Sequence, residues 1–357
     1  MKKENSNSLQ HPLVNMPSLL LSWYDGNKRE LPWRENPLPY SVWISEIMLQ
    51  QTRVEAVKPY FERFFTTFPT VASLAKAEET VLLKVWEGLG YYSRARNLQK
   101  AANMIIDEFN GQIPSMYEEL LRLPGIGDYT AGAVASIAFQ KAVPAVDGNV
   151  LRVYTRLVGS MENIGLPDVK KRIRADITEI LPKDRPGDFN QALMELGAVV
   201  CLPNGAPLCK NCPLSDGCVA REQNLQDKIP VKTPKKERRI EERTVFLLVS
   251  NGKVALCHRE NKGLLSNMWE FPNTIKGNEQ SIWDELGIKQ ANTEEFGIAK
   301  HIFTHVEWHM NGVLFFPKTE HVPAGWEWAD RAALTDIYPI PNAFKAYVRR
   351  LFKEELI

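Results

Sequence analysis

Four of the five cysteines in this 357-residue chain lie close together, with the spacing Cys201-x7-Cys209-x2-Cys212-x5-Cys218. Such a group predicts a metal site, because neighbouring thiolates need a cation between them. An iron–sulfur cluster, a tetrahedral zinc ion and disulfides remain open as alternatives. Disulfides are disfavoured because we find no secretion signal and the chain is long enough to bury a core without cross-links. Spacing alone does not identify the metal.

A carboxylate at position 46 could supply a proton. Glu46 lies in the segment Val42–Gln50, where apolar residues cover nearly every direction around a helix, which predicts a buried helix. Burying a lone carboxylate is costly unless it is paired or protonated, and burial raises its pKa. Glu46 is therefore either a structural group bonded to Arg34 or a backbone amide, or a general acid.

A second carboxylate, Asp147, precedes a helical pattern that starts at Val150. Its ordinary role there is to cap the helix. The helix dipole also favours the ionised form of a carboxylate in this position. A protonated acid paired with an ionised carboxylate is the arrangement that cleaves bonds between a sugar and a heteroatom. The segment Leu123–Gly127, LPGIG, is either an ordinary turn between helices or a hairpin whose backbone N–H groups bind phosphate.

Helices are expected to position these residues throughout the first two thirds of the chain. Apolar residues recur there at three- and four-residue spacing, which predicts an all-α domain over residues 18–226, preceded by a disordered tail at 1–17. The expected helices are Ser18–Trp23, Val42–Gln50, Val54–Phe65, Glu78–Glu87, Arg94–Phe109, Met116–Leu121, Thr130–Phe139, Val150–Val158, Val169–Ile180 and Phe189–Val200.

The pattern changes near residue 244. Residues 227–243 are basic and contain two prolines, which indicates a linker. Beyond them the apolar period becomes two, and Asn251-Gly252 separates two such runs, which predicts a β-hairpin. Residues 301–317 read as further strands, on which His301, His305 and His309 would share one face. With helical patterns at 281–286 and 343–356, residues 244–357 are expected to form an α+β domain.

Composition sets limits on the class of protein. Hydrophobic residues make up 44% of the chain and charged residues 24%, which is ordinary for a globular protein. The sequence contains no run of 18 apolar residues, so we expect no membrane span. Reduced cysteines without an export signal lead us to expect a cytoplasmic protein. The net charge of +1 does not decide whether it binds nucleic acid.

Taken together, these motifs resemble the endonuclease III (helix-hairpin-helix) superfamily of DNA glycosylases and, within it, the adenine DNA glycosylase (MutY) family. The resemblance covers residues 18–357, and the C-terminal part resembles the family's MutT (Nudix)-like recognition domain. The matching segments are LPWR at 31–34, PYSVWISEIMLQQTRV at 39–54, GLGYYSRARNL at 88–98, LPGIGDYTAGAV at 123–134, VDGNVLRV at 146–153, FNQALMELGA at 189–198, GLLSNMWEFP at 263–272 and FTH at 303–305.

The resemblance implies removal of adenine mispaired with 8-oxoguanine or guanine in double-stranded DNA, after the adenine is flipped out of the duplex. Glu46 would protonate adenine N7, and Asp147 would stabilise the oxocarbenium-like sugar, with Tyr129 and Asn149 orienting this chemistry. The other residues implied are an adenine pocket (Arg29, Leu31, Trp33, Arg34, Glu195), DNA contacts (Gln51, Thr52, Tyr91, Gly125, Gly127) and an 8-oxoguanine-sensing loop (Phe303, Thr304, His305).

The resemblance also favours a 4Fe–4S cluster on Cys201, Cys209, Cys212 and Cys218. Family members that cut the DNA backbone carry a lysine where this chain has Tyr129, so we expect a monofunctional enzyme that leaves an abasic site. A monomer associated with a bacterial nucleoid is expected.

Three features depart from the family pattern. Seven residues separate Cys201 and Cys209 where six are usual, and Thr304 replaces a serine. The C-terminal domain also lacks the carboxylate-rich box of Nudix hydrolases, which argues against a nucleotide hydrolase. The alternatives are a related glycosylase acting on thymine or uracil mismatches, an enzyme for oxidised pyrimidines, and a non-catalytic DNA-binding scaffold.

Overall fold

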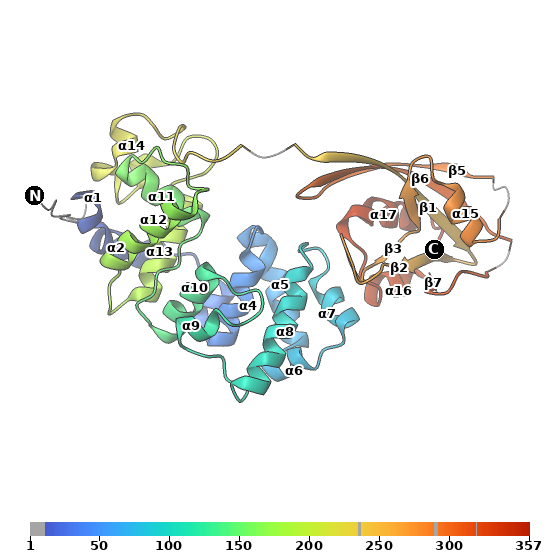
Figure 1. The fold of residues 1–357 in the computed structure, drawn as a ribbon, viewed down its shortest axis with the longest axis horizontal. Helices are drawn as coiled ribbons and strands as arrows, with labels where there is room; N and C mark the ends of the chain where they lie inside the picture. Colours follow the sequence, from blue (N-terminus) through green and yellow to red (C-terminus); the bar gives the residue numbers. More distant parts are fainter. Residues whose placement is uncertain (1–10, 235–236, 289–291, 319) are drawn as a thin grey trace, which may run out of the picture. The chain divides into compact units, whose positions relative to one another are not determined.

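The computed structural model describes residues 11–234, 237–288, 292–318 and 320–357 (Figure 1). The chain divides into two compact units. Unit 1 comprises Met1–Glu62, Pro69–Ala75 and Asn97–Pro234, and unit 2 comprises Arg63–Phe68, Lys76–Arg96 and Lys235–Ile357. The division after residue 234 falls inside the predicted linker at 227–243. The sequence did not predict that two pieces of the helical region group with the C-terminal residues.

The described part of unit 1 is helical, as predicted. Each helix expected from the 3.6-residue period is present, together with short ones that the period could not reveal because they last only about one turn. The α-helices lying wholly or mainly in unit 1 are α1 (His11–Val14), α2 (Met16–Asn27), α3 (Pro32–Glu35), α4 (Pro39–Leu49), α5 (Val54–Thr67), α6 (Val71–Ala75), α8 (Ser93–Glu108), α9 (Tyr117–Leu120), α10 (Asp128–Phe139), α11 (Gly148–Val158), α12 (Pro167–Ile180), α13 (Pro186–Val199) and α14 (Val219–Glu222).

The predicted disordered tail at 1–17 is wrong for residues 11–17. These residues form α1 and the start of α2, and the side chains of Leu13 and Met16 are buried. Burying two large apolar side chains stabilises the segment by several kcal/mol, at roughly 1.5–3 kcal/mol for each. Residues 1–10 lie outside the described residues.

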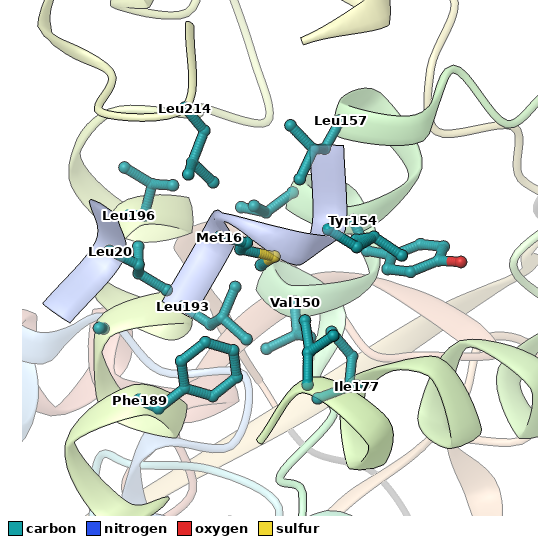
Figure 2. Packing of buried hydrophobic residues seen from close by; sticks show 14 of the residues in the cluster. Met16, Leu20, Val150, Tyr154, Leu157, Ile177, Phe189, Leu193, Leu196 and Leu214 are labelled. Atoms are coloured by element: carbon teal, nitrogen blue, oxygen red, sulfur yellow. The ribbon is translucent and has the colours of Figure 1, made fainter. Parts of the chain in front are cut away.

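One hydrophobic core of unit 1 brings together helices from both ends of its sequence. In Figure 2, Met16 and Leu20 of α2 face Val150 and Leu157 of α11 and Leu193 of α13. The cysteines of the 201–218 loop that pack against this core are Cys201, Cys212 and Cys218. The N-terminus of α11 and the cysteine loop are therefore both supported by the same packed side chains.

Gly132 lets α10 approach the segment that leads to Asp147. A Cβ atom at position 132 would lie 2.2 Å from the carbonyl oxygen of Pro144, which is closer than any real contact. We expect Gly132→Ala to lower the free energy of unfolding by about 1–3 kcal/mol, as overpacking does. Urea denaturation measures the change. Gly26→Ala is the matched control, because a Cβ on that helical glycine meets no atom within 4 Å.

Unit 2 is built on a mixed sheet, which confirms the α+β prediction. Strands run in the order β3-β2-β1-β6-β5, with β4 paired to β1 and β7 paired to β2. β1 pairs with β6 in parallel and with β2 antiparallel. The elements of unit 2 are α7 (Glu79–Trp86), β1 (Arg239–Ser250), β2 (Lys253–His258), β3 (Trp269–Glu270), β4 (Asn273–Ile275), α15 (Gln280–Glu285), β5 (Glu294–Ile302), β6 (Val306–Phe315), β7 (Trp326–Ala329), α16 (Arg331–Asp336) and α17 (Lys345–Lys353).

Both faces of this sheet are covered. Val245 and Leu247 of β1 pack with Phe344 and Leu351, which lie just before and within α17, whereas Phe246 packs on the opposite face, where α15 lies. Alternation along β1 therefore fills two cores, as expected for a strand buried on both sides.

Two local predictions in unit 2 have different outcomes. Asn251 and Gly252 form the turn between β1 and β2, and both have positive φ (46° and 72°), as a tight hairpin requires. The expectation that His301, His305 and His309 share one strand is wrong. His305 lies in the connection between β5 and β6, because the chain reverses direction there. No helix among the described residues is long and apolar enough to cross a membrane.

Candidate active site

One cavity of about 1050 Å³ in unit 1 collects most of the residues singled out from the sequence. Both carboxylates, Glu46 and Asp147, line it. So do other predicted site residues, namely Tyr129, Asn149, Arg29, Leu31, Trp33, Arg34, Glu195, Gln51, Thr52 and Gly127. Gly125 is not among the lining residues; it lies in the turn between α9 and α10, where its φ of 81° explains the need for glycine.

Glu46 is buried in α4, where every residue from Ser41 to Met48 is buried. The hydroxyl of Tyr129 donates a hydrogen bond to its Oε2. Burial raises the pKa of Glu46 to about 7; the hydrogen bond from Tyr129 opposes this rise and the nearby charge of Asp147 adds to it. Arg34, one of the two structural partners considered for Glu46 beside a backbone amide, donates instead to Gln191, Glu195 and the carbonyl of Arg29.

Asp147 caps α11 with its side chain. Oδ1 accepts hydrogen bonds from the backbone N–H groups of Asn149 and Val150, both at 2.8 Å, and Oδ2 accepts one at 2.7 Å from the side-chain amide of Asn149. Burial nevertheless raises the pKa of Asp147, while these donors and Arg152 oppose the rise. The helix start favours the ionised form of Asp147, but burial has the larger effect on its pKa.

The two carboxyl groups have different surroundings. Asp147 accepts three hydrogen bonds that stabilise a carboxylate, whereas Glu46 accepts one from a phenol. The partners of Asp147 therefore favour its charged form more strongly than the single partner of Glu46 does.

A charged network forms another wall of the cavity. Glu195 is 1% exposed and accepts from Arg29 (Nε to Oε1, 2.5 Å) and from Arg34 (Nη2 to Oε2, 2.8 Å). These bonds outweigh burial and lower the pKa of Glu195, so it stays ionised. Leu31 and Trp33 are buried beside the network and add apolar surface. The wall thus offers charged hydrogen-bonding groups next to a flat apolar surface, which suits a heteroaromatic base.

The sequence interpretation missed three residues. Gln191 accepts from Arg34 Nε at 3.1 Å, and Met194 lies 3.2 Å from the Tyr129 hydroxyl. Arg152 is buried and donates to Asn149 Oδ1 at 2.8 Å and to the carbonyl of Cys201 at 2.8 Å, so it connects the start of α11 with the cysteine loop. For two of them, the spacing from a predicted site residue could have indicated the contact. Gln191 precedes Glu195 by four residues and Arg152 follows Asn149 by three, which places each pair on one helix face.

The predicted DNA contact Tyr91 and the predicted 8-oxoguanine-sensing loop lie in unit 2. Tyr91, Phe303, Thr304 and His305 line a second cavity of about 920 Å³, and the hydroxyls of Tyr91 and Thr304 are 3.4 Å apart. Tyr91 has a φ of 48°, and Gln51 at the first cavity has a φ of 57°. Such backbone strain is uncommon for residues other than glycine and concentrates at functional sites.

The four cysteines of the loop are free thiols that line one small cavity. Arg156 and Arg221 also line it, and Arg156 Nη1 lies 3.3 Å from Cys201 Sγ. Within the described residues, no group of three or more His, Cys, Asp or Glu side chains is placed to hold a single metal ion. The donor set and its cationic surroundings nevertheless fit an anionic group ligated by four thiolates.

Comparison with known proteins places both units in families. Residues 44–183 match the model of the HhH-GPD superfamily of base excision DNA repair proteins, and residues 244–350 match the NUDIX domain. Among solved structures, a thermostable thymine-DNA glycosylase is 29% identical, with a TM-score of 0.54 over 59% of this chain and 97% of its own. A trapped endonuclease III–DNA covalent intermediate is 26% identical, with a TM-score of 0.51 over 59% of this chain and 95% of its own.

Three curated relatives extend across both units. The adenine DNA glycosylase of Homo sapiens is 34% identical over 87% of this chain and 69% of its own length. That of Buchnera aphidicola subsp. Acyrthosiphon pisum is 35% identical over 83% of this chain and 85% of its own. The adenine DNA glycosylase of Arabidopsis thaliana is 37% identical over 80% of this chain, which spans only 55% of that protein.

Proposed function

Because this chain belongs to the adenine DNA glycosylase family, we propose that it removes adenine mispaired with 8-oxoguanine or guanine from double-stranded DNA. The adenine leaves the base stack and enters the cavity lined by Glu46 and Asp147. The products are free adenine and an abasic site. The observation that supports the proposal is that two carboxyl groups, Glu46 and Asp147, line one cavity and have different hydrogen-bond partners.

The reaction starts with proton transfer from Glu46 to adenine N7, which makes the base a neutral leaving group. As the bond between the base and C1′ breaks, positive charge develops on the sugar and Asp147 stabilises it. Water then adds at C1′ and loses a proton to the Glu46 carboxylate, which restores the acid. Tyr129 holds the carboxyl group of Glu46, and Asn149 holds that of Asp147.

Single-turnover cleavage of duplexes with adenine opposite 8-oxoguanine, guanine, cytosine or thymine tests the substrate. We expect excision opposite 8-oxoguanine and guanine to be fastest. Preference for cytosine or thymine as the partner would contradict the proposal. Removal of thymine from a mismatch would support the second candidate, a mismatch thymine glycosylase, which the likeness to a thymine-DNA glycosylase favours.

The absence of an amine at position 129 leads us to propose monofunctional chemistry. A phenol has no amine and cannot form a Schiff base. Burial beside Glu46 and Asp147 also raises the pKa of Tyr129 well above its usual value, so the phenol is not an ionised nucleophile. Borohydride should therefore trap little covalent enzyme–DNA complex. Trapping as efficient as that of a lysine enzyme would refute this part of the proposal.

We further propose that the cysteine loop holds a 4Fe–4S cluster on its four thiols. Such a cluster would cross-link the loop, and the Arg156 guanidinium would balance its negative charge. Metal analysis of the purified protein should find about four iron atoms per chain, whereas a zinc site would give about one zinc ion.

Excision should depend on pH through Glu46. Because burial raises the pKa of Glu46 to about 7, the protonated form that donates to adenine predominates below pH 7 and is lost above it. We expect the single-turnover rate constant to fall about tenfold per pH unit on the alkaline side. Tyr129→Phe removes a hydrogen bond that lowers this pKa, so the alkaline limb should move to higher pH. A limb that is absent or unmoved would argue against Glu46 as the acid.

A further inference from the structure

The cavity lined by Glu46 and Asp147, which we call the base cavity, shares part of its lining with a second cavity of unit 1. This second cavity, of about 650 Å³, is lined by Tyr24, Gly26, Lys28, Glu35 and Asp188, together with other residues. Five residues line both cavities and so form the wall between them: Arg29, Leu31, Arg34, Ile137 and Gln191. We call the second space the outer cavity.

Hydrogen bonds hold the polar part of this wall together. Arg34 donates to Glu195, to the carbonyl of Arg29 at 3.1 Å and to Gln191 at 3.1 Å. The bond to Gln191 has a neutral acceptor and is therefore weaker than the bonds to Glu195. Gln191 is therefore the side-chain acceptor that Arg34 can release more easily than Glu195.

The other side of the base cavity is where DNA is proposed to lie. Gln51, Thr52 and Gly127, the proposed DNA contacts, line the base cavity, and none of them is among the described residues that line the outer cavity. A base freed inside the cavity is then enclosed by the duplex from which it came. It must wait for the DNA to dissociate or leave through the wall.

We propose that the outer cavity is the exit route and transient binding site for the excised purine, with Arg34 and Gln191 as the gate. This inference rests on the proposed glycosylase activity. Glu35 and Asp188 can accept hydrogen bonds from the amino group of a neutral purine, and Lys28 can donate to its ring nitrogens. The route would also return the cavity to a hydrated state while the abasic DNA stays bound.

The test separates cleavage from release. A duplex with radiolabelled adenine opposite 8-oxoguanine is mixed with excess full-length protein; alkali cleavage of quenched samples measures excision, and rapid ultrafiltration measures free adenine. We expect free adenine to appear before the abasic DNA dissociates. Gly26→Trp places a large side chain in the outer cavity, at a helical position where a Cβ meets nothing within 4 Å. It should slow adenine release about tenfold, the effect of a barrier higher by about 1.4 kcal/mol.

Excision and DNA dissociation should be unchanged in Gly26→Trp, and Gly26→Ala, which leaves the cavity open, should release adenine as the unmodified protein does. Glu30→Trp provides a second obstruction, on an exposed residue that also lines the outer cavity, in case the first variant does not fold. The inference is overturned if adenine leaves the unmodified protein only together with the DNA, or if a folded tryptophan variant releases it at the normal rate. Loss of excision with every duplex would instead count against the proposed function.

Discussion

Glu46→Gln should lower the single-turnover rate constant for adenine excision by about 10²–10⁴, the usual contribution of a general acid. Glutamine has nearly the same shape and can still accept the hydrogen bond from Tyr129. It cannot release a proton, however, so the adenine must leave as an anion. Because the buried side chain no longer carries an ionisable group, the free energy of unfolding should be unchanged or slightly higher at pH 8.

The measurement needs DNA affinity as well as rate. A gel-shift titration with a mispaired duplex should show binding within a few-fold of that of the unmodified protein. Loss of excision with DNA binding retained would exclude a non-catalytic DNA-binding scaffold. Glu55→Gln is the matched control, because Glu55 lines the same cavity but is exposed and paired with Lys58. Equal loss of activity in both variants would show that the acid at position 46 has no special role.

Asp147→Asn should reduce excision by about 10²–10³ while leaving the protein folded. The loss follows because the negative charge facing the developing oxocarbenium ion is removed, and electrostatic stabilisers of this kind contribute factors of that size. The fold is retained because asparagine caps a helix about as well as aspartate. The side-chain oxygen can still accept the backbone N–H groups of Asn149 and Val150.

Thermal unfolding and single-turnover rates together check this expectation. Asp330→Asn is the control, since Asp330 caps α16 in the same way by accepting from the N–H of Ala333 at 2.8 Å. That substitution should change neither stability nor excision. If Asp147→Asn keeps full activity, or loses activity only because it unfolds, Asp147 is a cap and nothing more.

Local sequence patterns predicted the helices and strands better than they predicted which residues contact one another. The buried helix around Glu46 followed from apolar residues on all sides, and α4 is buried from Ser41 to Met48. The cap at Asp147 followed from residue type and position. Short helices such as α3 and α6 were missed, because four or five residues cannot display a 3.6-residue period.

Contacts between residues far apart in the sequence could not be predicted from local sequence patterns. The bond from Tyr129 to Glu46 joins residues 83 positions apart, and Arg34 reaches Glu195 across 161 positions. The sequence interpretation offered Arg34 or a backbone amide as structural partners of Glu46, whereas Arg34 bonds to Glu195, Gln191 and the carbonyl of Arg29 in the wall of the cavity. The grouping of Lys76–Arg96 with the C-terminal residues likewise depends on tertiary packing that no local period records.

The double use of Asp147 has a consequence for the whole repair process. Its oxygens close the first turn of α11, and the same oxygens are proposed to face the reacting sugar. A variant such as Asp147→Asn, which keeps the oxygen that caps the helix but not the charge, would be a folded protein that still occupies the lesion. In a cell it would compete with working copies for mispairs and delay their correction, so its harm would exceed that of a variant that simply unfolds and is degraded.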